Sequence, residues 1–336
     1  MAKGKYDITD YFVPTKKRIP MHKGGPLGMG FLGFTAPELM QMAYALFTTL
    51  LILFTWTGVD DAAGLLWQRV TALSGTLVLW VVYQLWPCKA VMMCRMGYLL
   101  LMLGFWYPDT YEINQQFGSY DHVFAGLDQS LFGCQPALLF SECFSSRVVS
   151  ELMYMGYVSY YLFFVVTVFL IFIRDYRQVE RVAYMIFGGF FLCYVVFLLL
   201  PVTGPQYYYL AAGTEAIRSG SLPDIGHYFS QSTECLQAPG WRDGIFYNLC
   251  QMAHQTGERP TAAFPSSHVA IATLVMAICA KMRMWRWLTI LAVPYLFLCM
   301  STVYIQAHYA VDSIAGFFTG LLLFIVLGGR KLQKVS

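Results

Sequence analysis

The chain has 336 residues, of which 57% are hydrophobic and only 12% are charged. A soluble domain carries about 25% charged residues, so this composition excludes a soluble protein of this size. The net charge of +3 is small, and neither a basic arm with interleaved aromatic residues nor a nucleic-acid-binding motif is present, which argues against nucleic-acid binding. An aromatic content of 17% is typical of a membrane protein with Trp and Tyr at its interfaces.

Residues 1–36 are polar and basic, and the first long apolar run begins only after them. This segment lacks the apolar core of a secretory signal peptide. We predict a cytoplasmic tail that contacts anionic lipid, with a disordered lead-in as the alternative.

Eight apolar runs follow, each near the roughly 20 residues that a membrane-spanning helix needs. They cover residues 38–57, 66–86, 90–106, 152–173, 182–200, 268–282, 285–304 and 311–328. The sequence therefore predicts an all-α fold, a polytopic membrane helical bundle of about eight transmembrane helices. Residues 37–330 are expected to form one membrane domain.

The connections between these runs alternate in positive charge, and this alternation predicts the orientation. Lys89, Arg177 and Arg283 are among the bases of every second connection, whereas the first connection carries Asp60 and Asp61 and no base. Both termini are therefore expected in the cytoplasm. The membrane is expected to be a bacterial inner membrane or a eukaryotic endomembrane.

Two connections, residues 108–150 and 201–264, are too long for simple turns and face outward in this topology. Long external segments commonly carry or cover a functional site. Within the second, residues 241–254 mix aromatic and polar side chains and are expected to form a helix at the membrane interface.

Four of the nine cysteines lie in these outer segments, where an oxidising exterior permits disulfides. Four cysteines allow three pairings, and we favour the two local ones, Cys134–Cys143 and Cys235–Cys250. The five cysteines in or beside the apolar runs are expected to be inert. The sequence lacks Cys/His spacing of a zinc site, so no metal is expected.

Two histidines are followed four residues later by an acid: His308 by Asp312, and His254 by Glu258. In a helix, Asp312 would lie one turn on and on the same face as His308, where its carboxylate holds one ring nitrogen and leaves the other free. An acidic residue at the start of an apolar span is costly unless it has a partner. We predict a catalytic pair at His308 and Asp312, with a loop-stabilising pair as the alternative. For His254 and Glu258 the loop-stabilising reading is preferred.

The segment Pro265-Ser266-Ser267-His268 opens the sixth apolar run. Ser caps a helix start and Pro suits its first turn, and the exposed N–H groups there attract a phosphate. Ser266 and Ser267 add hydroxyl donors, and His268 is placed to give a proton to a leaving oxygen. The charge pattern puts His268 and His308 on the same, extracytoplasmic side. The alternative is a capped helix that happens to carry a histidine.

These two motifs resemble the second and third signatures of the type 2 phosphatidic acid phosphatase superfamily, PSGH and SRxxxxxHxxxD, with Ser301 opening the third. The resemblance implies that His308 is a nucleophile that forms a phosphohistidine. It further implies that Asp312 orients His308 and that His268 protonates the leaving group. No cofactor is expected, because the histidines and backbone amides suffice.

The chain departs from the family pattern at three positions. Thr302 stands where the third signature has Arg, and Ser267 where the second has Gly. Met252 stands where the first signature has a Lys seven residues before Arg-Pro. Two cations that clamp a phosphate are thus missing, which suits a phosphodiester better than a monoester. Three arginines are candidate replacements, the first being preferred: Arg259, Arg242 and Arg218.

The segments FPSSHVA and AHYAVDSIAG are similar to the branch that contains the inositol phosphorylceramide synthases, and WYPDTYEIN, LDQSLFGCQP and PVTGPQYYY resemble it more loosely. This resemblance implies transfer of a phosphoryl headgroup from a phospholipid to a ceramide-like acceptor, with the catalytic core in residues 182–328. With water as acceptor, the same site is a lipid phosphatase. A non-catalytic membrane protein is the third possibility. Gln206, Tyr207 and Tyr208 are expected to border a headgroup pocket, or else to form an ordinary aromatic belt.

Overall fold

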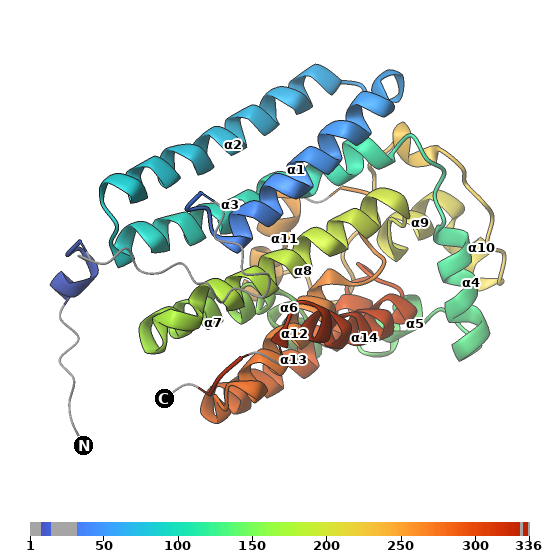
Figure 1. Cartoon of the computed structure of the whole chain (residues 1–336). Helices are drawn as coiled ribbons and strands as arrows, with labels where there is room; N and C mark the ends of the chain where they lie inside the picture. The colour runs from blue at the N-terminus through green and yellow to red at the C-terminus, as the bar shows by residue number, and fades with distance from the viewer. Residues whose placement is uncertain (1–7, 15–31, 258, 330–331, 335–336) are drawn as a thin grey trace.

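The structure, a computed structural model, describes residues 8–14, 32–257, 259–329 and 332–334 (Figure 1). Its regular elements over these residues are all helices, which confirms the all-α prediction. Each of the eight predicted apolar runs coincides with a helix or a pair of helices. They are α1 (Ala36–Phe54), α2 (Ala62–Leu85), α3 (Lys89–Asn114), α6 (Arg147–Val158) with α7 (Tyr160–Arg174), α8 (Val179–Leu199), α12 (Ser267–Lys281), α13 (Trp285–Tyr304) and α14 (Ala310–Val326).

Five helices are long and apolar enough to cross a membrane alone: α1, α2, α3, α13, and α8 with the preceding 3₁₀ turn η3 (Tyr176–Gln178). The run predicted at 152–173 is bent by 41° between α6 and α7, and this pair is a sixth candidate. α12 and α14 are apolar but have 15 and 17 residues. At 1.5 Å per residue they reach about 22 to 26 Å, short of the roughly 30 Å hydrocarbon core. The protein is an integral membrane helical bundle. Two of the eight predicted transmembrane helices, α12 and α14, are shorter than a full span.

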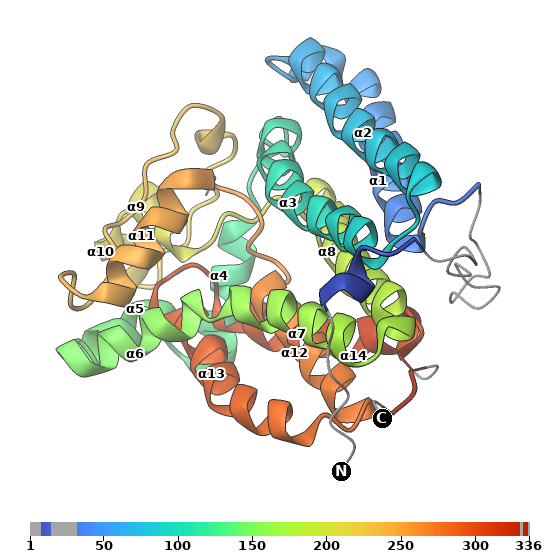
Figure 2. The same ribbon diagram turned by 90° about the vertical axis from the view of Figure 1, so that its left-hand side faces the viewer.

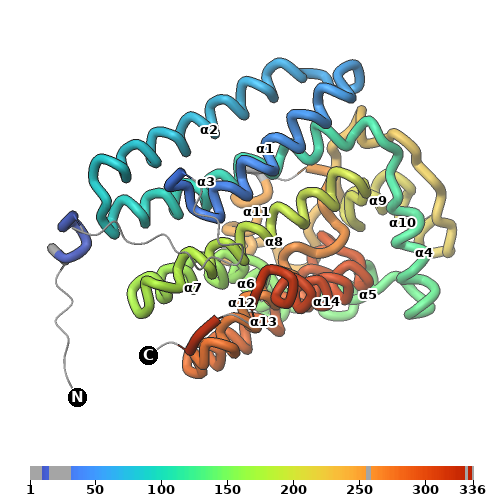
Figure 3. The backbone as a smooth tube through the Cα atoms, viewed as in Figure 1, coloured from blue at the N-terminus to red at the C-terminus, as the bar shows by residue number. Residues whose placement is uncertain are grey.

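The outer segments form short helices, and those within residues 121–143 and 205–218 gather at one end of the bundle, as the backbone tube shows (Figure 3). The predicted interfacial stretch 241–254 becomes a helix that begins at Ile245. These helices are α4 (Asp121–Phe132), α5 (Pro136–Cys143), α9 (Pro205–Ala212), α10 (Thr214–Arg218) and α11 (Ile245–Gly257). Three other 3₁₀ turns are η1 (Ile8–Tyr11), η2 (Trp56–Gly58) and η4 (Tyr228–Ser230).

α8 is the central helix of the bundle. It packs against α1 and α3 on one side and against α7, α12 and α14 on the other, so that α1–α2 and α12–α14 lie on opposite sides of it (Figure 2). Fifteen of its residues are buried, which is the highest burial among the candidate spans. The helices that carry the two histidine motifs are therefore shielded on this side by protein rather than by lipid.

α3 continues to Asn114, beyond the predicted end of the third run at Trp106 and through Pro108. Its last two turns carry polar side chains that are buried and paired. Asp109 forms an ion pair with Arg69 of α2 at 2.8 Å, and the Asn114 amide donates to the Phe197 carbonyl at 2.9 Å. Because these groups have protein partners, the helix extends past the apolar run that predicts it.

Neither of the two favoured disulfides is present, and none of the nine cysteines forms a disulfide within the described residues. Cys134 lies two residues before α5 begins, and Cys143 is the last residue of that helix. Cys235 instead lies beside His254, with 3.8 Å between its Sγ and Nε2 of His254. His254 lies one turn beyond Cys250 on α11.

Two glycines bring α14 directly onto α12. A Cβ at Gly316 would lie 2.6 Å from the Ser266 carbonyl oxygen, and one at Gly320 would lie 2.4 Å from that of Ala270. This is the small-residue spacing that lets membrane helices approach closely. The Ser266 amide donates to the Asp312 carbonyl at 3.1 Å, so the close approach joins the beginnings of the two helices that follow the histidine motifs.

Gly320→Leu is expected to lower the midpoint of thermal unfolding in detergent, because the new side chain meets backbone that cannot move aside. An overpacked contact of this kind costs about 1–3 kcal/mol. Gly104→Leu on α3 is the matched control, since a Cβ there meets nothing within 4 Å. Equal unfolding midpoints for the two variants would contradict the packing argument.

Candidate active site

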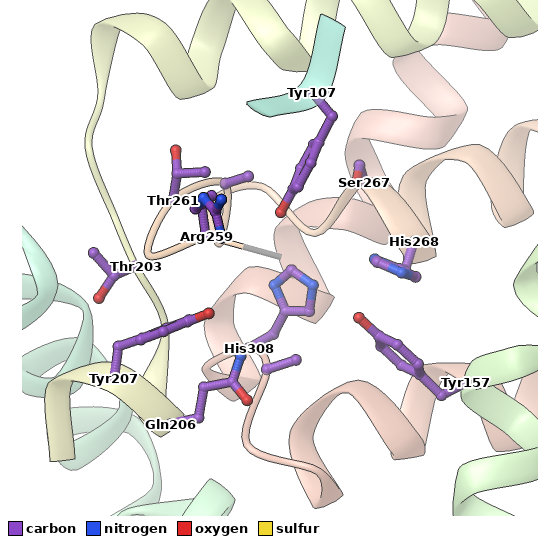
Figure 4. A pocket seen from close by; sticks show the side chains of 12 residues that line it. Tyr107, Tyr157, Thr203, Gln206, Tyr207, Arg259, Thr261, Ser267, His268 and His308 are labelled. Atoms are coloured by element: carbon purple, nitrogen blue, oxygen red, sulfur yellow. The ribbon is translucent and has the colours of Figure 1, made fainter. Parts of the chain in front are cut away.

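The two predicted histidines face one cavity at the end of the bundle where α12 begins and α13 ends (Figure 4). His268 lies in the first turn of α12 and His308 in the loop between α13 and α14. Their ring centroids are 5.7 Å apart. Arg259 lines the same cavity, whose volume is about 30 Å³. Two imidazoles and a guanidinium thus converge on one small cavity.

One ring nitrogen of His308 is held by the backbone. Nδ1 lies 2.7 Å from the carbonyl oxygen of Ala263, and the imidazole is buried. A carbonyl oxygen only accepts hydrogen bonds, so the proton is on Nδ1 and Nε2 carries the free lone pair. The His308 amide also donates to the Thr302 carbonyl at 3.0 Å. The ring is therefore fixed in the tautomer that leaves Nε2 available to attack an electrophile.

Asp312 lies beside His308, but the structure differs from the expected contact. Its Oδ2 is 3.8 Å from Nδ1 of His308 and accepts a hydrogen bond from the Tyr309 amide at 2.9 Å. The carboxylate caps the start of α14, so the Ala263 carbonyl takes the place at Nδ1 that the i, i+4 spacing predicts for Asp312. At 3.8 Å the fully buried carboxylate still stabilises positive charge on the imidazole.

His268 is clamped between two tyrosine rings. Its ring centroid lies 4.5 Å from that of Tyr157, with the planes at 24°, and 4.2 Å from that of Tyr160. Its Nδ1 is buried without a hydrogen-bond partner. Stacking of this kind fixes the plane of the imidazole and leaves a nitrogen free to exchange a proton with a bound ligand.

Asp121, at the start of α4, anchors the loop that carries His308. Its carboxylate is buried and accepts hydrogen bonds at 2.9 Å from the Tyr309 hydroxyl, from the Gly204 amide and from both the amide and the hydroxyl of Thr203. Burial raises the pKa of Asp121 above its usual range, while hydrogen bonds from Ser119, Thr203 and Gly204 lower it. This single carboxylate joins three segments around the cavity.

Asp128 lies two turns further along α4, and its side chain caps the start of a different helix, α14. Its two carboxylate oxygens accept from the amides of Ala310 and Val311, each at 2.9 Å. Burial raises the pKa of Asp128 and these two hydrogen bonds lower it. Together with Asp312 it satisfies the amides at the start of α14, which lie directly after His308.

The backbone on both sides of His308 is unusually tight. Gly204 has φ of +99°, and a Cβ there would lie 2.4 Å from the Ala307 carbonyl oxygen. Ala262 and Gln306 also have positive φ, of 71° and 64°, which is uncommon for residues other than glycine. The cavity wall is therefore made of backbone that tertiary contacts hold in a strained conformation.

Two of the three predicted phosphate-binding residues line the cavity. Ser267 and Arg259 line the cavity. Ser266 does not, because its hydroxyl caps α12 by accepting from the Val269 amide at 3.4 Å. Thr302 stands where the third signature has Arg. Its hydroxyl lies 2.8 Å from the Ser313 hydroxyl, and this contact joins α13 to α14. Thr302 therefore joins two helices and supplies nothing to the cavity.

Two of the three predicted headgroup residues line the cavity. Gln206 and Tyr207 line the cavity, whereas the Tyr208 hydroxyl donates to the Pro223 carbonyl at 2.8 Å, away from it. Successive residues of a helix point about 100° apart, so three consecutive positions cannot share one wall.

Of the remaining predicted arginines, Arg218 pairs with Glu142 at the surface and lines neither this cavity nor the one beside it. Arg242 and His254 line the neighbouring cavity. Glu258, the expected partner of His254, lies outside the described residues.

Besides two alanines, Ala262 and Ala307, the cavity wall contains four residues with hydroxyl groups that are not predicted as site residues: Tyr107, Tyr157, Thr203 and Thr261. They come from four separate parts of the chain. Tyr107 and Thr203 lie in the segments WYPDTYEIN and PVTGPQYYY, whose looser family resemblance is one signal in the sequence, and Thr261 lies close to the predicted segment 265–268. Among the described residues, no group of three or more His, Cys, Asp or Glu side chains is arranged to hold a metal ion.

A family model described as the PAP2 superfamily matches residues 122–326, well over half of the chain. The chain belongs to the PAP2 superfamily. Members of this superfamily are generally phosphatases or phosphotransferases that act on lipid phosphates. The matched region contains both histidines, Asp312, Asp128 and Arg259, and it begins one residue after Asp121. No curated protein and no solved structure matches the chain significantly.

Asp121→Ala is expected to destabilise the fold and to lower turnover more than stability alone explains, because five buried donors, the Ser119 hydroxyl included, lose their acceptor and the His308 loop is released. Buried unsatisfied groups cost about 1–3 kcal/mol each before relaxation. Thermal unfolding and initial rates in detergent measure the two effects. Asp243→Ala is the control, since Asp243 is exposed. Unchanged unfolding and turnover in Asp121→Ala would contradict the anchoring role.

Proposed function

We propose that this member of the PAP2 superfamily is a phosphotransferase that moves a phosphoryl headgroup from a phospholipid to a ceramide-type alcohol, through a phosphohistidine at His308. The observation that carries the proposal is the hydrogen bond from Nδ1 of His308 to the Ala263 carbonyl. That bond leaves Nε2 unprotonated at a cavity that also contains His268 and Arg259. A nucleophile with a fixed tautomer and a proton donor opposite it are the parts that covalent catalysis requires.

In the first half-reaction, Nε2 of His308 attacks phosphorus, so that an N–P bond forms and the P–O bond to the lipid alcohol breaks. The departing oxygen takes a proton from the His268 imidazolium. The phosphorylated imidazole is positively charged, and the buried Asp312 carboxylate 3.8 Å from Nδ1 stabilises that charge. Arg259 and Ser267 would hold the phosphate oxygens.

In the second half-reaction, the acceptor hydroxyl gives its proton to His268, which is now neutral, and its oxygen attacks phosphorus. An O–P bond forms, the N–P bond breaks, and both histidines return to their starting states. The cavity wall offers one arginine to the phosphate, Arg259, and the family's other two cations are replaced by Thr302 and Met252. A single guanidinium balances the one negative charge of a phosphodiester better than the two of a monoester, which favours a substituted phosphoryl group.

The proposed site faces away from the cytoplasm, with both termini cytoplasmic and membrane lipids as donor and acceptor. Four basic residues support this orientation, because they flank helix ends opposite to the end that carries the histidines: Lys89, Arg174, Arg181 and Lys281. We further propose that residues 37–330 form one membrane domain with its catalytic core in residues 182–328.

The donor test uses purified protein in detergent with phosphatidylinositol or phosphatidic acid, added ceramide, and products analysed by mass spectrometry. We expect a ceramide phosphodiester from phosphatidylinositol. Inorganic phosphate from phosphatidic acid without a ceramide product would instead indicate a lipid phosphatase that uses water as the acceptor. In vesicles that contain the protein, lipid movement between leaflets without turnover of either donor would indicate a non-catalytic membrane protein.

His308→Gln is expected to abolish turnover and the acid-labile label that a radioactive donor leaves on the protein, because the N–P bond cannot form. His268→Gln should slow turnover about 100- to 10,000-fold through loss of proton transfer. His227→Gln is the matched control, since His227 is exposed and lines neither cavity. Label that persists in His308→Gln would rule out this nucleophile.

A further inference from the structure

The segment of residues 259–263 carries two groups of the candidate active site. Arg259 at its start lines the cavity of the two histidines (Figure 4), and the Ala263 carbonyl at its end accepts a hydrogen bond from Nδ1 of His308 at 2.7 Å. The segment belongs to no helix. Its position relative to His308 is therefore set by contacts with the rest of the protein.

Asn114, the last residue of α3, provides one of these contacts. Its side-chain nitrogen donates to the Thr261 hydroxyl and to the Phe197 carbonyl of α8, each at 2.9 Å. A carbonyl only accepts hydrogen bonds, so the nitrogen of the amide and not its oxygen faces these two partners. Both N–H groups of the amide are thus in use. Asn114 is buried and does not line the cavity.

The hydroxyl of Thr261 has a fixed direction. Thr110 lies about one turn before Asn114, and its hydroxyl donates its one proton to the Tyr107 carbonyl at 2.7 Å. In the 3.5 Å contact between the hydroxyls of Thr110 and Thr261, Thr110 can therefore only accept. Thr261 accepts from Asn114 and donates to Thr110. The end of α3 thus holds the middle of the segment through both functions of one hydroxyl group.

The residue that follows Thr261 is strained. Ala262 has φ of +71°, which is uncommon for a residue with a Cβ. Such a conformation persists only where contacts on both sides maintain it. On one side the Ala263 amide donates to the Val202 carbonyl at 2.9 Å, and on the other side Asn114 holds Thr261. Release of Thr261 would let Ala262 relax and would move the Ala263 carbonyl away from His308.

We propose that Asn114 is a positioning residue for His308. Through Thr261 it keeps the Ala263 carbonyl at Nδ1, and so it keeps the imidazole proton on Nδ1 and the lone pair on Nε2. A neutral imidazole can carry its proton on either nitrogen, and a protonated Nε2 cannot attack phosphorus. This inference rests on the proposed function, in which His308 is the nucleophile, and it adds a residue that acts on the reaction without contact with the substrate.

The test reads the tautomer of His308 directly. In protein labelled with ¹⁵N-histidine and placed in lipid nanodiscs at alkaline pH, where histidine is neutral, NMR distinguishes protonated from unprotonated ring nitrogens. The His308 signals are those that disappear in His308→Gln. We expect a proton on Nδ1 in the unaltered protein and a mixture of the two tautomers in Asn114→Leu.

Tyr111→Phe is the matched control for this measurement. It removes a different hydrogen bond of a buried side chain from the same end of α3, which runs from the Tyr111 hydroxyl to the Phe229 carbonyl at 2.7 Å. This bond does not involve residues 259–263. We expect the His308 tautomer of Tyr111→Phe to match that of the unaltered protein.

Turnover provides the second measurement. Asn114→Leu should lower kcat for phosphatidylinositol about tenfold with KM nearly unchanged, because less of the enzyme has an unprotonated Nε2 while the cavity wall is intact. Thr261→Val should lower kcat and mix the tautomers in the same way, and it leaves the bond from Asn114 to Phe197 in place. Thr261→Ser keeps the hydroxyl and should behave as the unaltered protein. The Thr261 variants also decide the question if Asn114→Leu does not fold.

A proton that stays on Nδ1 of His308 in both Asn114→Leu and Thr261→Val would overturn the positioning role, whatever the turnover. So would an equal change of tautomer in Tyr111→Phe. A mixture of tautomers in the first two variants and not in Tyr111→Phe, with no turnover of any donor by the unaltered protein, would uphold the positioning of His308 and defeat the proposed function instead.

Discussion

The close contact between α12 and α14 is the constraint on which the site depends. Gly316 and Gly320 let the two backbones approach until a single added carbon would collide with carbonyl oxygens. That approach, together with the Ser266–Asp312 backbone hydrogen bond, sets the start of α14 against the start of α12. His268 lies in the first turn of α12, and His308 lies just before α14. The distance between the two imidazole rings therefore follows from the packing of these helices deeper in the bundle.

Buried carboxylates provide the second constraint. Asp121 and Asp128 lie seven residues apart on one face of α4 and together accept hydrogen bonds from residues 203, 204, 309, 310 and 311. Such groups are costly to bury, so each is matched by several donors. The result is a loop around His308 whose backbone has little freedom to move. A fixed tautomer at His308 requires this rigidity, because a shift in Ala263 would release Nδ1.

The distribution of charge is the basis of the proposed preference for a substituted phosphate. Arg259 stands at the cavity of the two histidines and Arg242 at the cavity beside it. The positive charge is thus divided between two neighbouring cavities, which share Gln206 and Tyr157 in their walls. Thr302, which replaces a family cation, bonds to Ser313 between two helices. The loss of that cation from the phosphate site is accompanied by the gain of a helix–helix contact.

The sequence by itself determined the helices and predicted the two histidines that face the cavity, because both follow from local patterns. Apolar runs predict helices since a bilayer leaves no other partner for the backbone, and Pro265-Ser266-Ser267-His268 predicts a capped helix start where α12 begins. Only the tertiary structure decided what holds these groups. The Ala263 carbonyl at Nδ1 of His308 and the Asp121 carboxylate at Tyr309 come from 45 and 188 residues away. No spacing along the chain encodes such contacts, because helix packing creates them.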